Sequence, residues 1–501
     1  MKHLFTFIFF MSLFTSLPVF SKTAEEWKSR SVYQIITDRF ARSNGDVQSC
    51  PDLNNYCGGT FKGIQNNLDY IKGMGFDAIW ISPVTANTPG GYHGYWTSNL
   101  YEINENFGTP EELKELIEAC HEQNIWIMVD VVANHVGYVE WVDGVPTYDK
   151  VVPFNDPSHY NPYSQCETID WNDQPSVETC WLTGLPDLDQ NHPFVRETLL
   201  NWARDFVKTY DIDALRIDTV PHVSKSFWSE FSQAAGVYTV GEILNMELNY
   251  LASYQGALDS VLNYALYSTL RYAFQNGGSM NSIESYYEAA NRVWPDITVL
   301  GNFVDNHDNP RFLSNSQNIE AFKSALGFSI CSVGLPMVYY GDEHAFSGGQ
   351  DPANRETLWT NMNTESDIYK FLKTLNNFRK MTGFYNLDQI QRYSDDTFYA
   401  FSRGDYLFAF TNSNEQQIRT LSFHPYSERT QLCNVLQKGD CVFVRNGEFQ
   451  VELVNGEMKI YAPNHVERED PLATTSAWKA IKLGLVSSSM FGVKSLDSSR
   501  I

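Results

Sequence analysis

The stretch TPEELKELIEACHEQNIWIMVDVVANH, residues 109–135, contains a helix followed by a strand. Thr109 fits the N-cap position, Pro110 fits the first turn, and Glu112 completes a capping box, so we expect a helix to begin here. Its apolar face is formed by Leu113, Leu116, Ile117 and Cys120. The apolar run from Trp126 to Val132 has the composition of a strand. This order predicts one α/β unit of a parallel sheet.

The same alternation of short β-rich segments and longer amphipathic segments continues from about residue 31 to residue 345. Eight segments are predicted to be strands: Val32–Thr37, Ala78–Pro83, Trp126–Val132, Ala214–Val220, Val237–Ile243, Ser260–Asn263, Ile297–Val304 and Pro336–Tyr340. Eight such units suggest a closed (β/α)8 TIM barrel, so the predicted fold class is α/β.

We expect the barrel to occupy residues 22–135 and 191–394, with an insertion after its third strand. This insertion, residues 136–190, is rich in Asp, Asn, Pro and Tyr, and a loop of that length is usually a functional subdomain. Residues 395–465 alternate like strands joined by tight turns, which predicts a C-terminal antiparallel β-sandwich domain. The tail, residues 466–501, carries only a weak resemblance to a lipid-anchor signal, and its structure is not predicted.

Residues 1–21 are interpreted as a signal peptide. Lys2 precedes an apolar run, Leu4 to Phe14, that is too short to span a membrane, and Val19 and Ser21 are small enough for a cleavage site after Ser21. The protein is therefore expected to be secreted or held at the cell surface. Retention in the secretory pathway or in a cell wall stays open.

The composition excludes several classes of partner. The 501 residues include 43% hydrophobic residues, which is normal for a folded protein. Asp and Glu total 60 against 36 Lys and Arg, so the formal net charge of -24 disfavours nucleic acids and anionic membrane surfaces. No later segment has the roughly 18 apolar residues of a transmembrane helix. We expect a monomer that binds a neutral, polar substrate.

The eight cysteines divide into two groups. Three close pairs can form disulfides in an oxidising compartment: Cys50 with Cys57, Cys166 with Cys180, and Cys433 with Cys441. Cys120 and Cys331 lie within apolar periodic segments and are interpreted as buried free thiols.

Polar residues occur at the ends of four predicted strands, the positions that form the active sites of such barrels. The segments are DVVANH (130–135), RIDTVPH (216–222), GE (241–242) and VDNHDNPR (304–311). They supply three carboxylates, Asp218, Glu242 and Asp308, which we expect to face one cleft. Each alone could be a strand-end cap or an ion-pair partner. Their occurrence together at separate strand ends favours catalysis.

Glycoside hydrolysis requires one ionised carboxylate and one protonated carboxyl group. Arg216 lies two residues before Asp218, on the same face of the strand, and its charge should keep Asp218 ionised. Two ionised aspartates in a shielded cleft should raise the pKa of Glu242. Glu242 is therefore the expected proton donor.

In this order and spacing, DVVANH, RIDTVPHV, GEIL and FVDNHDNPR resemble the four signature regions of the α-amylase family, glycoside hydrolase family thirteen. The resemblance is closest to fungal α-amylases of the Taka-amylase type, and it extends from about Ser31 to the DPANRE segment, residues 351–356. It implies a retaining mechanism in which Asp218 is the nucleophile, Glu242 the acid and base, and Asp308 the transition-state stabiliser.

The resemblance also implies a set of substrate-binding residues. Those around the cleavage site are Arg216, His135, His307, Tyr95, His93 and Trp96, with Tyr95 stacking on the sugar. Asp351 and Arg355 resemble the family's pair on the non-reducing side. An ion pair four residues apart on a helix is the alternative interpretation of Asp351 and Arg355.

Calcium is the cofactor that the resemblance implies. Its ligands would be Asn134, Glu178, Asp187 and the backbone carbonyl of His222, because Ca²⁺ prefers oxygen ligands. Without the resemblance, Glu178 and Asp187 would be read as solvated loop acids.

One departure from the family affects the acceptor side of the cleft. Pro221 stands where the family usually has Lys, so one contact to the leaving group is lost. The first hypothesis is an endo-acting retaining α-1,4-glucan hydrolase on starch-like or glycogen-like α-glucans. The alternatives are a 4-α-glucanotransferase acting on cell-wall α-glucan and a non-catalytic amylase-like protein that binds glycans.

Overall fold

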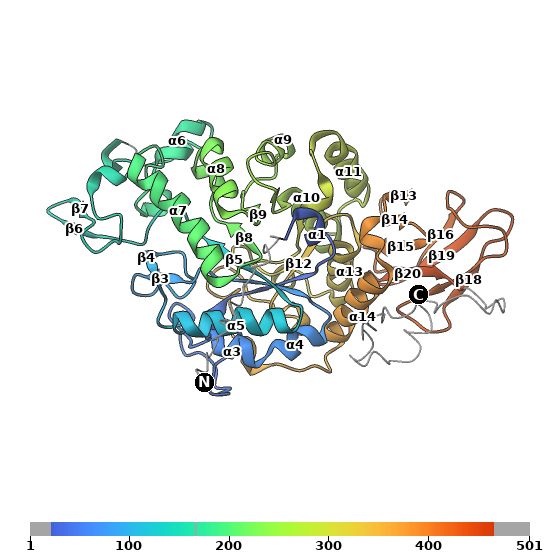
Figure 1. Cartoon of the computed structure of the whole chain (residues 1–501). Coiled ribbons are helices and arrows are strands. Elements are labelled where there is room, and N and C mark those ends of the chain that lie inside the picture. Colours follow the sequence, from blue (N-terminus) through green and yellow to red (C-terminus); the bar gives the residue numbers. More distant parts are fainter. Residues whose placement is uncertain (1–21, 166–167, 465–501) are drawn as a thin grey trace, which may run out of the picture.

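The computed structural model describes residues 22–165 and 168–464 of the chain (Figure 1). The expected signal peptide, the C-terminal tail and Cys166 lie outside the described residues. Within these two ranges, no helix combines the length and the apolar character needed to cross a membrane.

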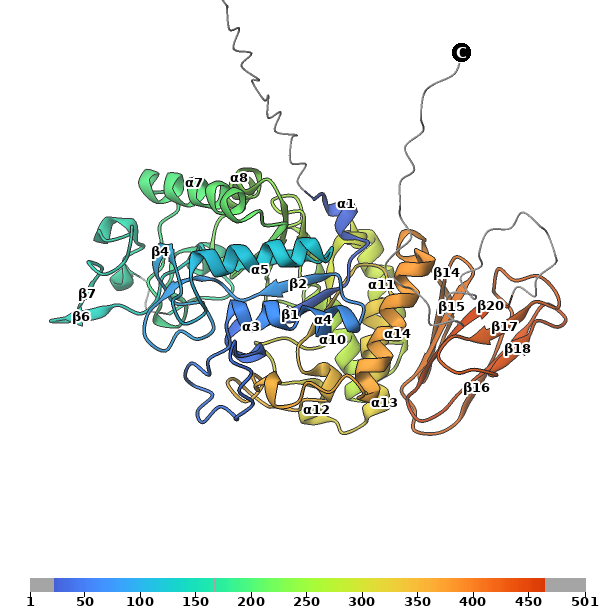
Figure 2. The same cartoon turned by 60° about the horizontal axis from the view of Figure 1, so that its bottom comes forward.

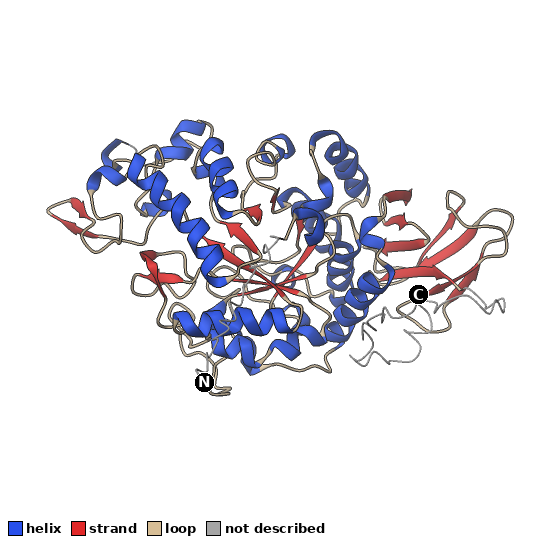
Figure 3. Ribbon diagram, viewed as in Figure 1, coloured by secondary structure: helices blue, strands red, loops and turns tan. Residues whose placement is uncertain are grey.

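Eight parallel strands form the sheet at the centre of the N-terminal domain (Figure 3). They are β1 (Val32–Ile35), β2 (Ala78–Ile81), β5 (Trp126–Val131), β8 (Ala214–Ile217), β9 (Tyr238–Gly241), β10 (Ser260–Val261), β11 (Gly301–Asn302) and β12 (Leu335–Tyr339). Their order is β10-β9-β8-β5-β2-β1-β12-β11, and a parallel bridge between Leu262 and Gly301 closes the sheet. The predicted (β/α)8 barrel is confirmed.

Successive residues of each strand face the surrounding helices and the barrel interior in turn. On β5, Ile127 and Val129 belong to the core cluster that also contains the helix residues, whereas Met128 belongs to a second cluster inside the barrel. Asp130 continues the interior series and is in register with Arg216 of β8. The pleat therefore brings these two charged side chains into the interior at the carboxyl end of the barrel.

Helices cover the outside of the barrel (Figures 1 and 2). The longer ones are α3 (Phe61–Asn66), α4 (Leu68–Gly73), α5 (Pro110–Glu122), α7 (Pro193–Tyr210), α8 (Lys225–Ala235), α10 (Tyr264–Leu270), α11 (Asn281–Val293), α13 (Ile319–Cys331) and α14 (Asp367–Thr382). The shorter ones are α1 (Ala24–Trp27), α2 (Thr37–Phe40), α9 (Leu248–Ala252) and α12 (Phe312–Asn315). Helix α5 has the expected capping box between Thr109 and Glu112, and its apolar face is buried.

Two irregular regions project from the carboxyl end of the barrel strands. The first is the hairpin of β3 (Thr85–Asn87) and β4 (Thr97–Ile103). The second is the insertion between β5 and β8, which holds the hairpin of β6 (Glu140–Val142) and β7 (Val145–Thr147) and helix α6 (Gln174–Thr179). Figure 1 shows the β6–β7 hairpin at one extreme of the molecule.

The C-terminal domain is an antiparallel β-sandwich, as predicted. Its larger sheet, in spatial order, contains β13 (Gln389–Ser394), β14 (Phe398–Arg403), β15 (Tyr406–Thr411), β20 (Met458–Pro463), β17 (Gln431–Asn434) and β18 (Cys441–Phe443). The smaller sheet pairs β16 (Gln417–Leu421) with β19 (Phe449–Leu453). Buried side chains of both sheets, among them Leu407 and Val451, form one core. Strand β13 begins before residue 395, where we expected this domain to start.

The sandwich packs directly against helix α13 of the barrel. Gly327 of α13 allows a close approach at this contact, because a Cβ atom there would lie 2.0 Å from Sδ of Met458 on β20 and would displace the Met side chain. The neighbouring Phe328 packs its ring against Phe410, at 5.1 Å between centroids, and against Phe401, at 5.6 Å. This apolar contact joins the two domains.

One predicted strand is only partly formed in the structure. The segment Ile297–Val304 is only partly a strand: Ile297–Val299 forms the 3-10 helix η6, and only Gly301 and Asn302 pair as β11. The side chain of Asp296 accepts a hydrogen bond from the backbone N–H of Thr298 at 2.8 Å, which stabilises a turn in spite of the β-branched residues.

The cysteine predictions are confirmed where the structure describes them. Disulfides join Cys50 to Cys57 and Cys433 to Cys441. Cys120 and Cys331 are buried free thiols. The predicted pairing of Cys166 with Cys180 involves a residue outside the described ranges.

Candidate active site

One buried arginine organises the carboxyl end of the barrel. Nη1 of Arg216 donates hydrogen bonds to Oδ1 of Asp130 at 3.0 Å and to Oδ1 of Asp218 at 2.8 Å. The side chain of Arg216 is 1% exposed, so these charge-assisted bonds form away from water. Asp130 also accepts a hydrogen bond from the indole N–H of Trp80 at 3.1 Å. Asp130 therefore holds Arg216, and Arg216 holds Asp218, in the arrangement expected for an ionised Asp218.

Glu242 follows β9 and reaches the same guanidinium group. Its Oε2 lies 3.7 Å from Nη2 of Arg216 and accepts a hydrogen bond from the backbone N–H of Thr219 at 2.9 Å. Burial, helped by the negative charges of Asp218 and Asp308, raises the pKa of Glu242 to about 8, against the opposing effects of Arg216 and of the Thr219 N–H. Glu242 is therefore protonated at neutral pH, as a proton donor must be.

Thr219 adopts a strained backbone at this point. Its φ of 47° lies in the left-handed region, which β-branched residues rarely occupy. This conformation directs the N–H toward Glu242 and begins the 3-10 helix η4 (Val220–His222). Strain of this kind is typical of functional sites, where the surrounding structure maintains it.

Asp308 completes the group of carboxylates. It follows β11, and its Oδ1 lies 3.3 Å from Nε2 of His307 and 3.8 Å from Nη2 of Arg355. Its side chain is 29% exposed, more than that of Asp218 or Glu242. Because the charge of Asp308 acts on the pKa of Glu242, the three acids share one electrostatic environment.

The predicted histidines and Tyr95 surround these acids. The ring of Tyr95 is parallel to that of His307 within 2°, and its hydroxyl donates to Oδ2 of Asp130 at 2.8 Å. Nε2 of His135 lies 3.2 Å from the carbonyl oxygen of Tyr95, and the ring of His93 stacks on Tyr95 at 5.6 Å. Burial lowers the pKa of His307 and of His93 to about 3, and it also lowers the pKa of His135. All three rings are therefore neutral hydrogen-bonding groups.

Trp96 lies next to this cluster. Its ring contacts His93 edge-on, with 4.6 Å between centroids, and contacts Tyr138 of the insertion at 5.0 Å. The aromatic surface thus continues from the acids toward the insertion.

Asp351 and Arg355 form an ion pair, but not on a helix. Nη1 of Arg355 lies 3.1 Å from Oδ1 of Asp351 in a segment of turns, so the helical alternative was wrong. Tyr92 contacts both residues: its hydroxyl donates to Oδ1 of Asp351 at 3.2 Å and lies 3.1 Å from Nη1 of Arg355. Nε of Arg355 donates to the carbonyl oxygen of His307 at 3.0 Å, which connects the pair to the loop that carries Asp308.

A cavity of about 500 Å³ opens beside Glu242 on the side of Pro221. Its walls include the apolar side chains of Trp171, Leu182, Pro221 and Leu244. Trp171 is 67% exposed, and its ring contacts His222 edge-on at 5.8 Å. The carbonyl oxygen of Pro221 accepts a hydrogen bond from the side chain of Gln174 at 2.9 Å. An aromatic wall thus occupies the side of the cleft that lacks the family's Lys.

Three of the four candidate calcium ligands meet in the structure. One terminal atom of the Asn134 amide lies 3.0 Å from Oδ1 of Asp187 and 3.0 Å from the carbonyl oxygen of His222. If that atom is the amide oxygen, three buried oxygens converge, and a cation is needed to offset their repulsion; if it is the nitrogen, it donates to the other two. The donors are those that Ca²⁺ prefers. The residues therefore fit calcium.

Glu178 is placed differently from the other three. Its Oε1 accepts a hydrogen bond from Nε2 of Gln174 at 2.9 Å. The preceding residue, Val177, approaches the site through its carbonyl oxygen, 3.0 Å from Nδ1 of His222. Among residues 22–165 and 168–464, no group of three or more His, Cys, Asp or Glu side chains could hold a metal. At Asn134 the converging groups are one carboxylate, one amide and one backbone carbonyl.

Sequence reasoning did not assign roles to three residues of this site. Asp130 holds Arg216, Thr219 donates to Glu242, and Gln34 of β1 contacts Nδ1 of His307 at 2.8 Å. A charged residue inside the apolar run WIMVDV was a signal that could have identified Asp130. No sequence signal distinguishes Gln34 or the left-handed backbone of Thr219.

Comparisons with known proteins agree with this geometry. Residues 34–389 match the family described as "Alpha amylase, catalytic domain". An α-amylase of Saccharomycopsis fibuligera is 38% identical over 462 residues, which cover 88% of this chain and 92% of that protein.

Solved structures give the same result. An α-amylase from Malbranchea cinnamomea has a TM-score of 0.84 at 37% identity, with 88% of this chain and 98% of that chain covered. A cyclomaltodextrin glucanotransferase with a three-domain ABC distribution has a TM-score of 0.76 at 25% identity, with 87% and 99% covered.

Proposed function

The chain belongs to the α-amylase family of glycoside hydrolases, and from this premise we propose that it is an endo-acting enzyme that hydrolyses α-1,4 bonds in starch-like or glycogen-like glucans with retention of configuration. The observation that carries the proposal is that one buried guanidinium group, that of Arg216, contacts both Asp218 and Glu242, while burial keeps Glu242 protonated. A retaining hydrolase needs this combination of an ionised and a protonated carboxyl group.

The mechanism assigns one role to each acid. Glu242 donates its proton to the glycosidic oxygen as the bond from that oxygen to the anomeric carbon breaks, and the carboxylate of Asp218 attacks the same carbon to form a glycosyl-enzyme. The ionised Glu242 then takes a proton from water, which attacks the anomeric carbon and releases Asp218. Asp308 stabilises the positive charge that develops on the sugar through its own charge and through hydrogen bonds to the hydroxyl groups.

The surrounding residues position the sugar. His135 and His307, both neutral, are suited to exchange hydrogen bonds with sugar hydroxyls, and Tyr95 offers the face of its ring. His93 and Trp96 support that ring and extend the aromatic surface. Asp351 and Arg355 bind hydroxyls on the non-reducing side, and their contacts with Tyr92 and His307 support this assignment.

Calcium would be held by Asn134, Asp187 and the carbonyl of His222, whereas Glu178, the fourth ligand that the resemblance implied, bonds to Gln174 instead. When bound, the ion supplies a link between β5, the insertion and η4, and no chemical step passes through it. The convergence of the Asn134 amide on Oδ1 of Asp187 and the carbonyl oxygen of His222 supports this part of the proposal. The close cysteine pairs and the N-terminal sequence support secretion, and the protein would act as a monomer.

A second candidate activity is 4-α-glucanotransfer. It is favoured by the aromatic cavity beside Glu242, because a sugar bound there could intercept the glycosyl-enzyme in place of water. The non-catalytic alternative is not retained, because the chain belongs to a family of enzymes and Glu242 is held in the protonated state.

Incubation with maltoheptaose tests the proposal. Hydrolysis gives only shorter oligosaccharides, and proton NMR of the first products should show the α-anomer. Products longer than the substrate would establish transfer as the main activity. Absence of any cleavage, or release of the β-anomer first, would overturn the proposed function.

A further inference from the structure

A buried glutamine inside the barrel contacts one of the histidines of the candidate active site. Gln34 lies on β1, two residues after Val32, and the pleat directs both side chains into the barrel interior. Gln34 is 3% exposed, and its Nε2 lies 2.8 Å from Nδ1 of His307. A buried amide destabilises the fold unless it is hydrogen-bonded, and His307 supplies a partner for this one.

The contacts of the opposite ring nitrogen decide where the hydrogen of His307 lies. Nε2 of His307 is 2.7 Å from the hydroxyl oxygen of Tyr95. That hydroxyl donates its own hydrogen to Oδ2 of Asp130 at 2.8 Å, and the same Oδ2 accepts hydrogen bonds from Trp80 and Arg216, both at 3.1 Å. The Tyr95 oxygen is therefore left to accept from His307, so Nε2 of the imidazole carries a hydrogen.

A neutral imidazole has only one such hydrogen. Burial lowers the pKa of His307 to about 3, so the ring is neutral and Nδ1 presents a lone pair. This lone pair needs a donor, and the amide N–H of Gln34 is the group in reach. The contacts of Tyr95 on one side of the ring thus determine that Gln34 turns its amide nitrogen toward the other side.

The position of this hydrogen matters for Asp308. Nε2 of His307 lies 3.3 Å from Oδ1 of Asp308, so an N–H faces the carboxylate. In the opposite tautomer, a lone pair of Nε2 would face the same oxygen and repel it. The loop itself is fixed, because the carbonyl oxygen of His307 accepts from Nδ2 of Asn354 at 2.9 Å and from Nε of Arg355 at 3.0 Å. The orientation of the ring then depends on the groups that contact its nitrogens.

We infer that Gln34 is a positioning residue: its amide donates to Nδ1 of His307 and holds the ring in the tautomer whose Nε2–H faces Tyr95 and Asp308. Gln34 acts through His307, which can then donate to the Asp308 carboxylate or to a sugar hydroxyl. The effect of Gln34 on the reaction rests on the proposed function. The tautomer of His307 is a property of the protein without substrate and can be measured independently.

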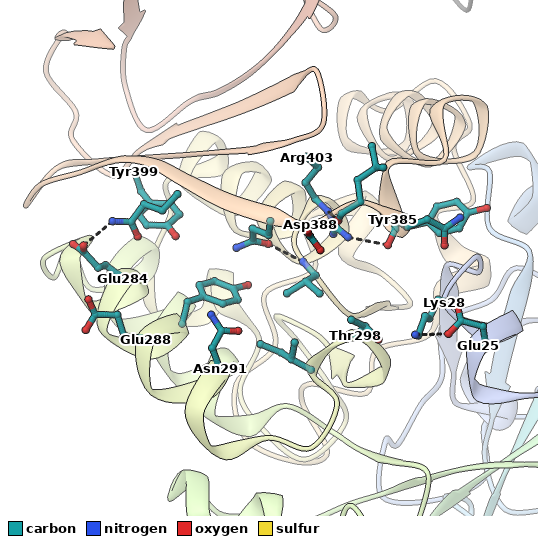
Figure 4. A pocket seen from close by; sticks show the side chains of 17 residues that line it. Glu25, Lys28, Glu284, Glu288, Asn291, Thr298, Tyr385, Asp388, Tyr399 and Arg403 are labelled. Carbon is teal, nitrogen blue, oxygen red and sulfur yellow. Dashed lines mark hydrogen bonds and ion pairs between the residues drawn. The ribbon is translucent and has the colours of Figure 1, made fainter. Parts of the chain in front are cut away.

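Two substitutions separate the amide donor from the space that it fills. Gln34→Met keeps the length of the side chain without a donor, and Gln34→Glu keeps its shape with a carboxyl group. The control is Gln389→Met. Gln389 lines a separate cavity of about 740 Å³ at the seam between the barrel and the C-terminal domain (Figure 4), where its side-chain oxygen accepts from the backbone N–H of Val333 at 2.8 Å. This control loses one hydrogen bond at the amino end of β12, away from the cleft.

The two Gln34 variants should respond differently to pH. At low pH the carboxyl group of Gln34→Glu is protonated and can donate to Nδ1, so kcat on maltoheptaose should approach that of the parent. As the pH rises this group ionises and accepts a hydrogen from Nδ1, which leaves Nε2 without one, so the ratio of kcat to the parent value should fall. Gln34→Met lacks a donor at every pH and should lose about 3- to 10-fold in kcat, the equivalent of one hydrogen bond. The charged groups that act on His307, namely Asp308, Arg355 and Arg216, are present in every variant.

NMR of the whole chain labelled with [¹⁵N]histidine reports the tautomer directly. Two-bond ¹H–¹⁵N correlations show which ring nitrogen carries the hydrogen, and His307→Gln assigns the signal. We expect hydrogen on Nε2 of His307 in the parent and in Gln389→Met, and on Nδ1 in Gln34→Glu at high pH.

A hydrogen on Nδ1 of His307 in the parent would overturn the inference, and that measurement requires no Gln34 variant to fold. A kcat of Gln34→Met as high as that of Gln389→Met would also overturn it, as would a ratio of Gln34→Glu to parent that does not change with pH. Failure of the parent to cleave maltoheptaose would instead refute the proposed function and leave the tautomer assignment in place.

Discussion

The backbone N–H of Thr219 donates a hydrogen bond to Oε2 of Glu242 at 2.9 Å. Arg216 approaches the same oxygen, at 3.7 Å. Oε2 is therefore surrounded by donors, which leaves Oε1 to carry the proton in the acid form. The left-handed backbone of Thr219 thus orients the carboxyl group as well as contacting it.

Replacement of this carboxyl group should abolish acid catalysis. Glu242→Gln keeps the shape of the side chain and can still accept from Thr219, but the amide cannot donate a proton to the leaving oxygen. We expect kcat on maltoheptaose to fall by about 10²- to 10⁴-fold, the usual contribution of general acid–base catalysis. Release of reducing ends measures the loss, and Glu118→Gln on α5 is the matched control. Activity within a few fold of the parent would show that another group is the acid.

The pH profile should report the raised pKa of Glu242. Because the protonated form is active, kcat/KM should fall as the pH rises through about 8. The charge of Asp308 contributes to the raised pKa, so Asp308→Asn should lower the overall rate and move this basic limb to lower pH. Asp351→Asn removes the same charge from the non-reducing side and should leave the limb in place. If the basic limb of the pH profile stayed in place in Asp308→Asn, the charge of Asp308 would not influence the pKa of Glu242.

The sequence was sufficient to predict the barrel because its strands are continuous apolar segments and capping residues mark the helices between them. Trp126–Val131 is a continuous apolar run, and the capping box at Thr109 marks the preceding helix. Ile297–Val299 shows the limit of such patterns. Its β-branched residues indicate a strand. The hydrogen bond that the Asp296 side chain accepts from the backbone N–H of Thr298 favours a 3-10 turn instead, and strand propensity does not include such a local contact.

The three acids proposed as catalytic were singled out in the sequence because each follows a strand, but the groups that contact their cluster were not. Gln34 reaches His307 across 273 positions of the chain, and Asp130 reaches Arg216 across 86. Contacts between distant segments depend on strand order and register, which the sequence pattern does not specify. The cavity at the seam of the two domains was missed for the same reason, because neither domain alone contains it.

Calcium should stabilise the fold through Asp187. We expect a chelator to lower the melting temperature and excess Ca²⁺ to restore it, because a ligand that binds only the folded state at about 100 times its Kd stabilises that state by ~2.7 kcal/mol. Asp187→Asn should remove the response, whereas Asp189→Asn, two positions away, should keep it. Differential scanning calorimetry gives the readout. If a chelator left the melting temperature of the parent protein unchanged, the proposed calcium site would be wrong.

His121 should make stability depend on pH. Its Nε2 lies 2.8 Å from Oδ2 of Asp213 and its Nδ1 lies 3.4 Å from Oδ2 of Asp211. The hydrogen bond to Asp213 and the charges of both aspartates raise the pKa of His121, against burial and Lys22. The stabilisation is therefore fully present below the unfolded pKa of about 6.5 and is lost as the pH rises through the folded pKa.

The comparison of the parent with His121→Gln isolates this effect. We expect the parent to be more stable than the variant at pH 5.5, and this difference in unfolding free energy should shrink by about 0.2 to 1 kcal/mol at pH 8.5. This is the range measured for partly exposed ion pairs. Denaturant titrations at the two pH values measure it. The same difference at both pH values would show that the ion pair contributes nothing.

Trp171 should determine how the acceptor side of the cleft binds sugar. It is 67% exposed on the wall of the cavity beside Glu242, and Pro221 there offers no charged contact, so stacking on this indole is the main attraction available to a sugar. Loss of an aromatic contact worth about 0.5 to 1.5 kcal/mol should lower kcat/KM for maltoheptaose by about 2- to 10-fold in Trp171→Ala. Any products longer than the substrate should decrease in parallel, because acceptor and leaving group occupy the same wall.

Trp141→Ala on β6 removes another exposed indole, away from this cavity, and should leave both readouts unchanged. If Trp171→Ala matched Trp141→Ala in rate and in product lengths, the acceptor would have to bind elsewhere in the cleft.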